Sequence, residues 1–272
     1  MNAVAIIAAH ELRTVLRSRL VAGFGILFCG LALAITFGGL AASGQLLVQG
    51  FTRTAVSLLN LSLYLLPLLG LVLGATAFSA PHDGTELLLA QPVGRTAALL
   101  GRALGLAGAF ALVAGAGFGA AALLVAVQAG TDGFGGFLAA SIGATLVGLA
   151  GLGVGVLLGV STRTRAAATG AALAAWFAAA VLYDLAAILV LQLFGSGDVD
   201  GLLVTLLTLN PIDGARTLGL VSLGADVLLG PTGAALEHAL GGAGGAWIVA
   251  SLAAWLVAPL GVAAWRFGRR DF

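Results

Sequence analysis

One acidic residue lies well inside a long apolar run, and it is the first candidate for chemistry. Asp184 belongs to the run Ala174–Phe194 and stands ten residues before its end, which in a helix corresponds to about 15 Å. An ionisable residue at membrane depth is costly to keep and often serves a gate, an ion path or a proton relay. Asp184 could pair with Arg53 or Arg216, gate a path or stay protonated. The alternative is a structural hydrogen bond between two helices.

Two further residues have the types found in a serine hydrolase, but their positions argue against catalysis. Ser43 stands at the end of an apolar run, in Gly39–Gln45, and His238 lies beside Glu237 before another apolar run. An intramembrane serine protease needs its serine and histidine together at membrane depth, and neither residue is expected there. The sequence also lacks a phosphate-binding loop, so we expect a non-catalytic chain that hydrolyses no nucleotide itself.

The composition places the chain in the membrane class. Hydrophobic residues make up 60% of the chain and charged residues 8%, whereas a soluble domain carries about 25% charged residues. So few charges cannot cover a surface that faces water on all sides. The formal net charge of +1 provides no basic field for nucleic acid.

Six long apolar runs predict six membrane-spanning helices, because about 20 helical residues cross the hydrocarbon core. The spans are expected at about 20–41, 54–78, 97–128, 136–161, 166–194 and 244–265. Runs rich in small residues, such as Gly148–Gly159, suit close approach between helices in a membrane. The sequence therefore predicts an all-α polytopic membrane protein with one transmembrane domain, residues 1–272.

The distribution of arginine predicts how the chain is oriented. If the N-terminus is inside and the spans alternate, only Arg53 and Arg216 of the twelve basic residues fall outside. Basic residues concentrate in the inner loops of membrane proteins. We therefore expect a multi-pass protein of the cell inner membrane, with both termini in the cytoplasm.

This orientation also argues against a metal site. His10 and His82 are expected in the cytoplasm and His238 outside, so the three histidines cannot converge on one ion. Cys29 is the only cysteine and Met1 the only methionine, so the soft ligands that favour Cu(I) are scarce. We expect no metal and no cofactor bound by this chain.

Two short elements are predicted on the cytoplasmic side. Residues 2–18 have apolar positions at helical spacing, which predicts an amphipathic helix in the membrane interface. Between the second and third spans, Pro81 and Pro92 bracket a block in which Asp83 can cap a helix, so a short helix is expected at 82–91. Each of the two could dock on a soluble partner or simply rest on the bilayer.

The longest stretch between spans, 195–243, is predicted to form a cap on the outer side. Gly201–Asn210 is apolar but too short to cross the bilayer as a helix. Asn210–Gly233 contains the turn signals Asn-Pro, Asp-Gly and Gly-Pro. We expect a re-entrant or interfacial helix followed by an outer loop.

These elements resemble a known family, the permease subunits of ABC exporters of the second type. Asp83–Arg95, DGTELLLAQPVGR, is similar to the family's coupling region, where acids precede Gly-Thr, a leucine block, Pro and Arg. His10–Arg19, HELRTVLRSR, resembles its elbow helix. Pro81 and His82 depart from the pattern, because further acids are usual there. The resemblance implies six spans, an elbow helix, a coupling helix and a re-entrant outer segment between the fifth and sixth spans.

The resemblance also implies roles for individual residues. The elbow helix would include His10, Glu11 and Arg13. The residues implied to contact a cytoplasmic ATPase are Asp83, Gly84, Thr85, Glu86, Leu87, Leu88, Leu89 and Arg95. The residues implied in the periplasmic cap are Asn210, Pro211, Asp213, Arg216 and Asp226.

Shorter stretches resemble a subgroup of the family that serves maturation of the copper sites of nitrous oxide reductase. They are AASGQL (Ala41–Leu46), YDL around Asp184, LNPIDGAR (Leu209–Arg216) and SLGAD (Ser222–Asp226). The resemblance implies a homodimer in membrane lipid, a separate ATPase that holds ATP and Mg, and a periplasmic partner protein. Two alternatives stay open: a permease of the same architecture that exports a lipid, peptide or drug, and an ion-coupled carrier that uses Asp184.

Overall fold

Helices make up nearly all of the described chain, as expected where backbone polar groups must be satisfied inside a membrane. The computed structural model describes residues 3–42, 50–79, 94–194, 199–224 and 229–269, and these ranges contain no strand. The helices are α1 (Ala3–Leu16), α2 (Arg19–Ala42), α3 (Gly50–Phe78), α5 (Arg95–Ala129), α6 (Phe134–Ser161), α7 (Arg165–Phe177), α8 (Tyr183–Phe194), α9 (Val199–Leu209), α10 (Pro211–Ser222), α11 (Pro231–Leu240) and α12 (Gly244–Gly268). A π-helical turn, η1 (Ala178–Leu182), joins α7 to α8, and a 3₁₀ turn, η3 (Gly241–Ala243), joins α11 to α12.

Six stretches within the described residues are long and apolar enough to cross a membrane, as the sequence predicted. They are Arg19–Gly38, Thr54–Phe78, Arg95–Gln128, Phe134–Ser161, Arg165–Phe194 and Thr232–Gly268. The bounds lie within a few residues of those expected, except that the last stretch also takes in most of α11 and η3. The all-α polytopic fold class is therefore confirmed.

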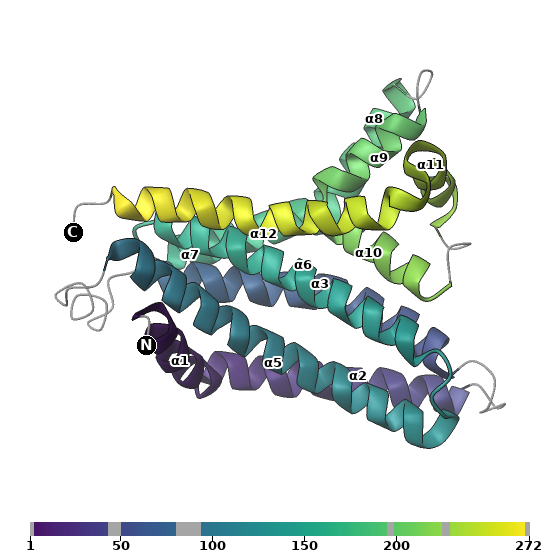
Figure 1. Ribbon diagram of the computed structural model, residues 1–272, viewed down its shortest axis with the longest axis horizontal. Helices are drawn as coiled ribbons and strands as arrows, with labels where there is room; N and C mark the ends of the chain where they lie inside the picture. The colour runs from purple at the N-terminus through teal and green to yellow at the C-terminus, as the bar shows by residue number, and fades with distance from the viewer. Residues whose placement is uncertain (1–2, 43–49, 80–93, 195–198, 225–228, 270–272) are drawn as a thin grey trace.

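The two ends of the helix bundle differ in what they carry (Figure 1). At one end lie both termini, the end of α3 and the start of α5, and we call it the terminal end. Helices α9, α10 and α11 lie toward the other end, which we call the cap end. The predicted coupling helix at 82–91 would leave from the terminal end, but its residues lie outside the described ranges.

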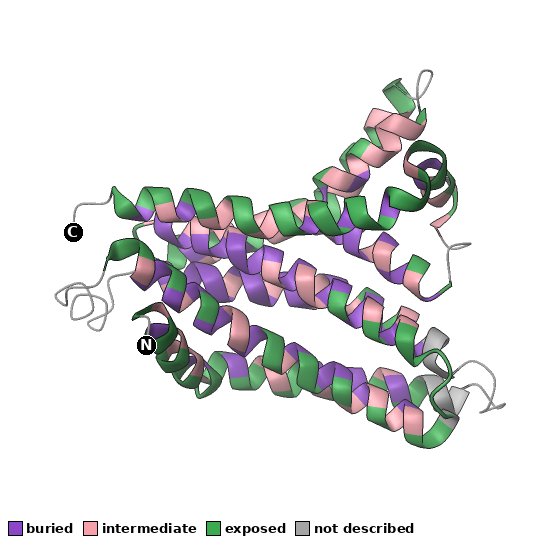
Figure 2. Ribbon diagram, viewed as in Figure 1, coloured by how far each residue is buried: buried purple, intermediate pink, exposed green. Residues whose placement is uncertain are grey.

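The core of the bundle is the pair α3 and α6, the most extensive helix contact in the described chain. Buried residues concentrate along these two helices in Figure 2. A Cβ added to Gly155 would lie 2.3 Å from the carbonyl oxygen of Leu71, and one added to Gly151 would lie 2.8 Å from that of Pro67. The close approach predicted from Gly148–Gly159 is therefore confirmed, because only glycine fits at these two positions.

Helix α1 packs against α5 and makes little contact with α2, the helix that follows it in the chain. A Cβ added to Gly105 of α5 would meet the Cβ of Glu11 at 2.6 Å and the carbonyl oxygen of Ala8 at 2.7 Å. The N-terminal helix therefore lies directly against the third span at the terminal end.

The fifth span is the most loosely attached of the six. Only 6% of its most apolar window is buried within the chain, against 56% for α3 and for α6. Its first half, α7, packs on α3, whereas α8 contains no buried residue. The change occurs at η1, where the N–H of Tyr183 donates to the carbonyl oxygen of Ala178, five residues back.

The cap contains more helix than the sequence predicted. Asn210–Gly233 was expected to be an outer loop, yet Pro211–Ser222 forms α10. The Asn-Pro pair that signals a turn is also a helix start, with Asn210 as N-cap and Pro211 in the first turn. Helices α9 and α10 form a hairpin, and α10 packs on α6, α12 and α3.

Candidate functional site

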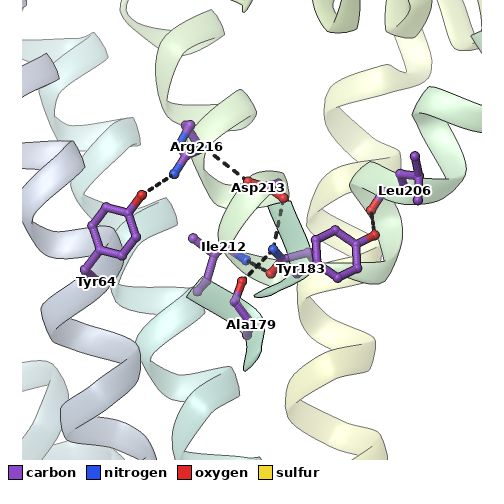
Figure 3. A network of polar contacts seen from close by, with 8 residues as sticks. Tyr64, Ala179, Tyr183, Leu206, Ile212, Asp213 and Arg216 are labelled. Atoms are coloured by element: carbon purple, nitrogen blue, oxygen red, sulfur yellow. Dashed lines mark hydrogen bonds and ion pairs between the residues drawn. The ribbon is translucent and has the colours of Figure 1, made fainter. Parts of the chain in front are cut away.

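The tip of the α9–α10 hairpin is held by the side chain of Asn210, which is only 2% exposed. Its Oδ1 accepts a hydrogen bond from the N–H of Ile212 at 3.1 Å and so caps α10. Its Nδ2 donates to Oδ2 of Asp213 at 2.9 Å and to the carbonyl oxygen of Ala179 in η1 at 3.0 Å. One buried amide thus joins the hairpin to the fifth span (Figure 3).

One turn further along α10, Arg216 joins the hairpin to the second span. It donates to Oδ1 of Asp213 at 3.2 Å and to the phenolic oxygen of Tyr64 at 2.9 Å, as Figure 3 shows. Tyr64 lies midway along α3, and its carbonyl oxygen accepts a hydrogen bond of 2.9 Å from Nε1 of Trp176 in α7. The network therefore connects α3, α7, η1 and α10.

The environment of Asp213 favours its neutral form. Burial raises the pKa of the Asp213 carboxyl above its ordinary value of 3.8, because burial penalises the charged form. The Arg216 guanidinium acts in the opposite direction, the Asp184 carboxylate again raises the pKa, and the Asn210 amide lowers it. The burial effect prevails even though Asp213 is hydrogen-bonded to a cation.

Asp184 lies beside this network on α8, and of the two pairings considered for it in the sequence, the one with Arg216 is not formed. Arg216 is engaged by Asp213 and Tyr64 instead. The reason is local geometry: Asp213 stands three residues before Arg216 on the same helix, a favourable spacing for an ion pair. The side chain of the other candidate, Arg53, lies outside the described residues.

The adjacent residue, Tyr183, binds the first helix of the hairpin. Its hydroxyl donates to the carbonyl oxygen of Leu206 at 2.5 Å, in the last turn of α9, where backbone carbonyls have no partner within the helix. A cavity of about 270 Å³ lies between α8, α9 and α10 and is lined by Tyr183, Asp213 and Arg216 together with leucines. The polar groups at the tip thus border a space that extends along the fifth span.

A set of hydrogen bonds between α12 and the α9–α10 hairpin was not predicted from the sequence. Three residues at helical spacing on α12 donate hydrogen bonds to Thr208: Nε1 of Trp247 to its Oγ1 at 2.9 Å, Oγ of Ser251 to its carbonyl oxygen at 3.0 Å, and Nε1 of Trp255 to the same carbonyl oxygen at 3.2 Å. A Trp-x₃-Ser-x₃-Trp pattern in an apolar run could have drawn attention, because a polar stripe at a spacing of four residues marks one helix face.

At the terminal end, Arg102 joins three helices. Its Nε lies 3.6 Å from Oε2 of Glu11 on α1, and its NH2 donates to the carbonyl oxygen of Ala77 in α3 at 2.8 Å. The guanidinium carbon lies 4.8 Å from the ring centre of Phe78, a cation–π distance. Arg102 therefore sits between the N-terminal helix and the residues from which segment 80–93 departs.

Other residues singled out in the sequence have simpler settings. His10 and Arg13 are exposed on α1. Arg95, implied in ATPase contact, donates to the carbonyl oxygen of Gly268 at 3.4 Å, at the end of α12. The remaining predicted residues, Asp83–Leu89 and Asp226, lie outside the described ranges.

His238, considered and rejected as a protease residue, is exposed, and its Nδ1 lies 2.6 Å from Oδ2 of Asp200. This contact joins α11 to α9. No group of three or more potential metal ligands occurs among the described residues.

Comparison with known proteins assigns the chain to a family. The family described as "ABC-2 family transporter protein" matches residues 5–272. The chain is 35% identical over 248 residues to a protein of Stutzerimonas stutzeri named "Probable ABC transporter permease protein NosY", covering 84% of this chain and 89% of that protein. It is 34% identical over 275 residues to a protein of the same name from Pseudomonas aeruginosa, covering 97% of each. The chain therefore belongs to the ABC-2 family and is a multi-pass ABC transporter permease.

Proposed function

We propose that this chain is the permease of a NosDFY-like transporter and serves maturation of the copper sites of nitrous oxide reductase. The observation that carries the proposal is the similarity to two NosY permeases over 84% and 97% of the chain. It acts as a homodimer in the inner membrane, with a NosF-like ATPase on the cytoplasmic side and a NosD-like protein on the periplasmic side. The terminal end faces the cytoplasm and the cap end faces the periplasm.

In this proposal the chain is not an enzyme, and ATP hydrolysis belongs to the partner. ATP with Mg binds the NosF-like subunit, which contacts the helix expected at 82–91 through Asp83–Leu89. The contacts of Arg102 support a mechanical link between the ATPase and the membrane helices, because this residue of α5 binds both the end of α3 and α1. A push on the segment between Phe78 and Arg95 therefore reaches the second span, the third span and the N-terminal helix together.

At the cap end, the same motion reaches the periplasmic partner through the α9–α10 hairpin. Arg216 binds Tyr64 at the middle of the second span, so displacement of α3 is transmitted to α10. Asn210 transmits it to the fifth span. The cargo is a copper or sulfur species, or the subunit transmits motion alone.

Association with the ATPase tests the coupling role. We expect the triple change of Leu87, Leu88 and Leu89 to serine to abolish co-purification of the NosF-like ATPase in detergent. Val221→Ser, a change of an exposed apolar residue on α10 at the cap end, serves as the control and should leave association intact. Retained association in the triple variant would contradict the proposed contact.

Co-purification with both proposed partners, the NosF-like ATPase and the NosD-like protein, tests the assignment to a NosDFY-like transporter. We expect a stable complex with an ATPase and a periplasmic protein, and ATPase activity that depends on the permease. Metal and sulfur analysis of that complex then identifies the cargo. A complex with an ATPase alone would instead favour the export of a lipid, peptide or drug.

A further inference from the structure

The carbonyl of Ala179 lies where the fifth span changes its hydrogen-bond register. In a regular α-helix the N–H of Tyr183 would donate to the carbonyl oxygen of Ala179, four residues back. Here it donates to the carbonyl oxygen of Ala178 instead. A π turn of this kind accommodates one extra residue in a helix, and such turns are frequent at functional sites.

The cap supplies a hydrogen bond to the carbonyl from which the Tyr183 N–H has moved away. Nδ2 of Asn210 donates to the carbonyl oxygen of Ala179 at 3.0 Å. The amide comes from a residue that is 2% exposed, and a polar backbone group is costly to leave unpaired at membrane depth. Asn210 therefore stabilises the π turn relative to a regular turn.

A second hydrogen bond runs in the opposite direction, from the fifth span to the cap. The hydroxyl of Tyr183 donates to the carbonyl oxygen of Leu206. Each partner thus satisfies one backbone carbonyl of the other, and the two contacts lie on either side of the register change. The orientation of α8 and the position of the hairpin tip are consequently set together.

We propose that Asn210 is a positioning residue that holds the fifth span in its π register. When the amide withdraws, the Tyr183 N–H returns to Ala179, and α8 turns by one residue. One residue of an α-helix corresponds to about 100° and 1.5 Å. This turn carries Tyr183 away from Leu206 and redirects Asp184. Two discrete arrangements of one element are what coupling between distant sites requires.

The register change can be tested on this chain without the ATPase, although its use in transport rests on the proposed function. Loss of ATPase association would bear on the proposed function alone. A change in the rotation of α8 about its own axis, which we call its phase, would bear on the proposed role of Asn210 alone. The experiment below measures only the second of these.

Two neighbouring alanines provide matched reporters of the phase of α8. Ala187 lines the 270 Å³ cavity together with Leu203 of α9, whereas Ala186 is exposed. A turn by one residue brings Ala186 to the place of Ala187. In a Cys29→Ser background, Leu203→Cys is therefore combined with either Ala187→Cys or Ala186→Cys, and membranes are treated with a short bifunctional thiol reagent.

We expect cross-linking to favour position 187 when Asn210 is present. Asn210→Ser should lower the ratio of cross-linking at 187 to that at 186 by about tenfold, the scale of one lost buried hydrogen bond. Serine still caps α10 but is too short to reach Ala179. An unchanged ratio, or a parent chain that does not favour 187, would overturn the proposal.

A one-residue deletion separates the register from general damage to the cap. Ala178–Ala180 are three consecutive alanines, so removal of any one gives the same chain and takes out the residue that the π turn accommodates. This variant should keep cross-linking at 187 even when Asn210→Ser is added. If it cross-links through 186, the proposal is wrong.

Discussion

Arg102 donates a hydrogen bond of 2.8 Å to the carbonyl oxygen of Ala77, and so joins the third span to the last turn of the second. The same guanidinium faces Glu11 of α1 at 3.6 Å. With side chains only 12% and 16% exposed, Arg102 and Glu11 are shielded from the water that weakens surface ion pairs. The terminal end is therefore held by one cation shared among three helices.

We expect Arg102→Ala to destabilise the permease by about 2 kcal/mol, because it leaves the Glu11 carboxylate and the Ala77 carbonyl without this donor. Thermal unfolding in detergent measures the loss. Stimulation of the partner ATPase should fall as well. Arg13→Ala, which removes an exposed arginine from α1, is the control. Equal melting temperatures for the two variants would contradict the assigned role.

The contact between α1 and α5 predicts a sharp difference between two glycines of the same helix. Gly105→Ala places a Cβ within 2.7 Å of atoms on α1, whereas Gly119→Ala meets nothing within 4 Å. We expect the first change to cost about 1–3 kcal/mol through overpacking, and the second to be neutral or slightly stabilising. Limited proteolysis should show earlier cleavage near α1 in the Gly105 variant only.

Asp184→Asn tests whether the acid of the fifth span takes part in transport. Asparagine keeps the size of the side chain but removes the charge and the titratable proton. If Asp184 serves an ion path or a gate, the variant should assemble with its partners and lose activity. Intact assembly together with intact activity would limit Asp184 to a structural role, and would also count against the ion-coupled carrier.

Stability should depend on pH through Asp213. Its pKa is raised in the folded chain, so the folded state binds the proton more readily than the unfolded state. The cost of the buried carboxylate is present above the folded pKa and is removed as the pH falls through that value. The melting temperature of the wild type relative to Asp213→Asn should therefore rise as the pH falls from neutral toward 3.8.

An exposed acid provides the control for this pH experiment. Asp132 lies in the turn between α5 and α6 and is exposed. The pH-dependent change in melting temperature should be larger for Asp213→Asn than for Asp132→Asn, because only the first variant removes a buried carboxyl. If the Asp213 variant behaves like the Asp132 variant, burial does not control the protonation of Asp213.

The fold was largely predictable because the length and the apolar composition of a segment are enough to identify a membrane span. Six apolar runs and the small residues of Gly148–Gly159 sufficed to predict the spans and a close helix contact. The helix α10 was missed because Asn-Pro and Asp-Gly signal turns as well as helix starts. Which of these forms depends on packing against α6 and α12, and local sequence does not contain that information.

Only part of the candidate site was singled out in the sequence, and the partners Tyr64 and Ala179 were not among the residues named there. Asn210, Asp213 and Arg216 were singled out from the cap motif, yet their link to Ala179 spans 31 residues and their link to Tyr64 spans 152. Such partners depend on how distant helices pack. The π turn could not be predicted from the sequence either, because its three alanines are equally common in a regular α-helix.

The run Ala178–Ala180 has a consequence for how the sequence of this permease can evolve. Loss of a single alanine codon there would remove the residue that the π turn accommodates and leave the rotation of α8 unchanged, whereas gain of one would shift every later residue of the fifth span around the helix axis. The face of α8 that this chain presents to the cap is therefore sensitive to chain length as well as to residue type. Alignments with homologous permeases are best compared by the number of residues between Trp176 and Tyr183, in addition to the residue types.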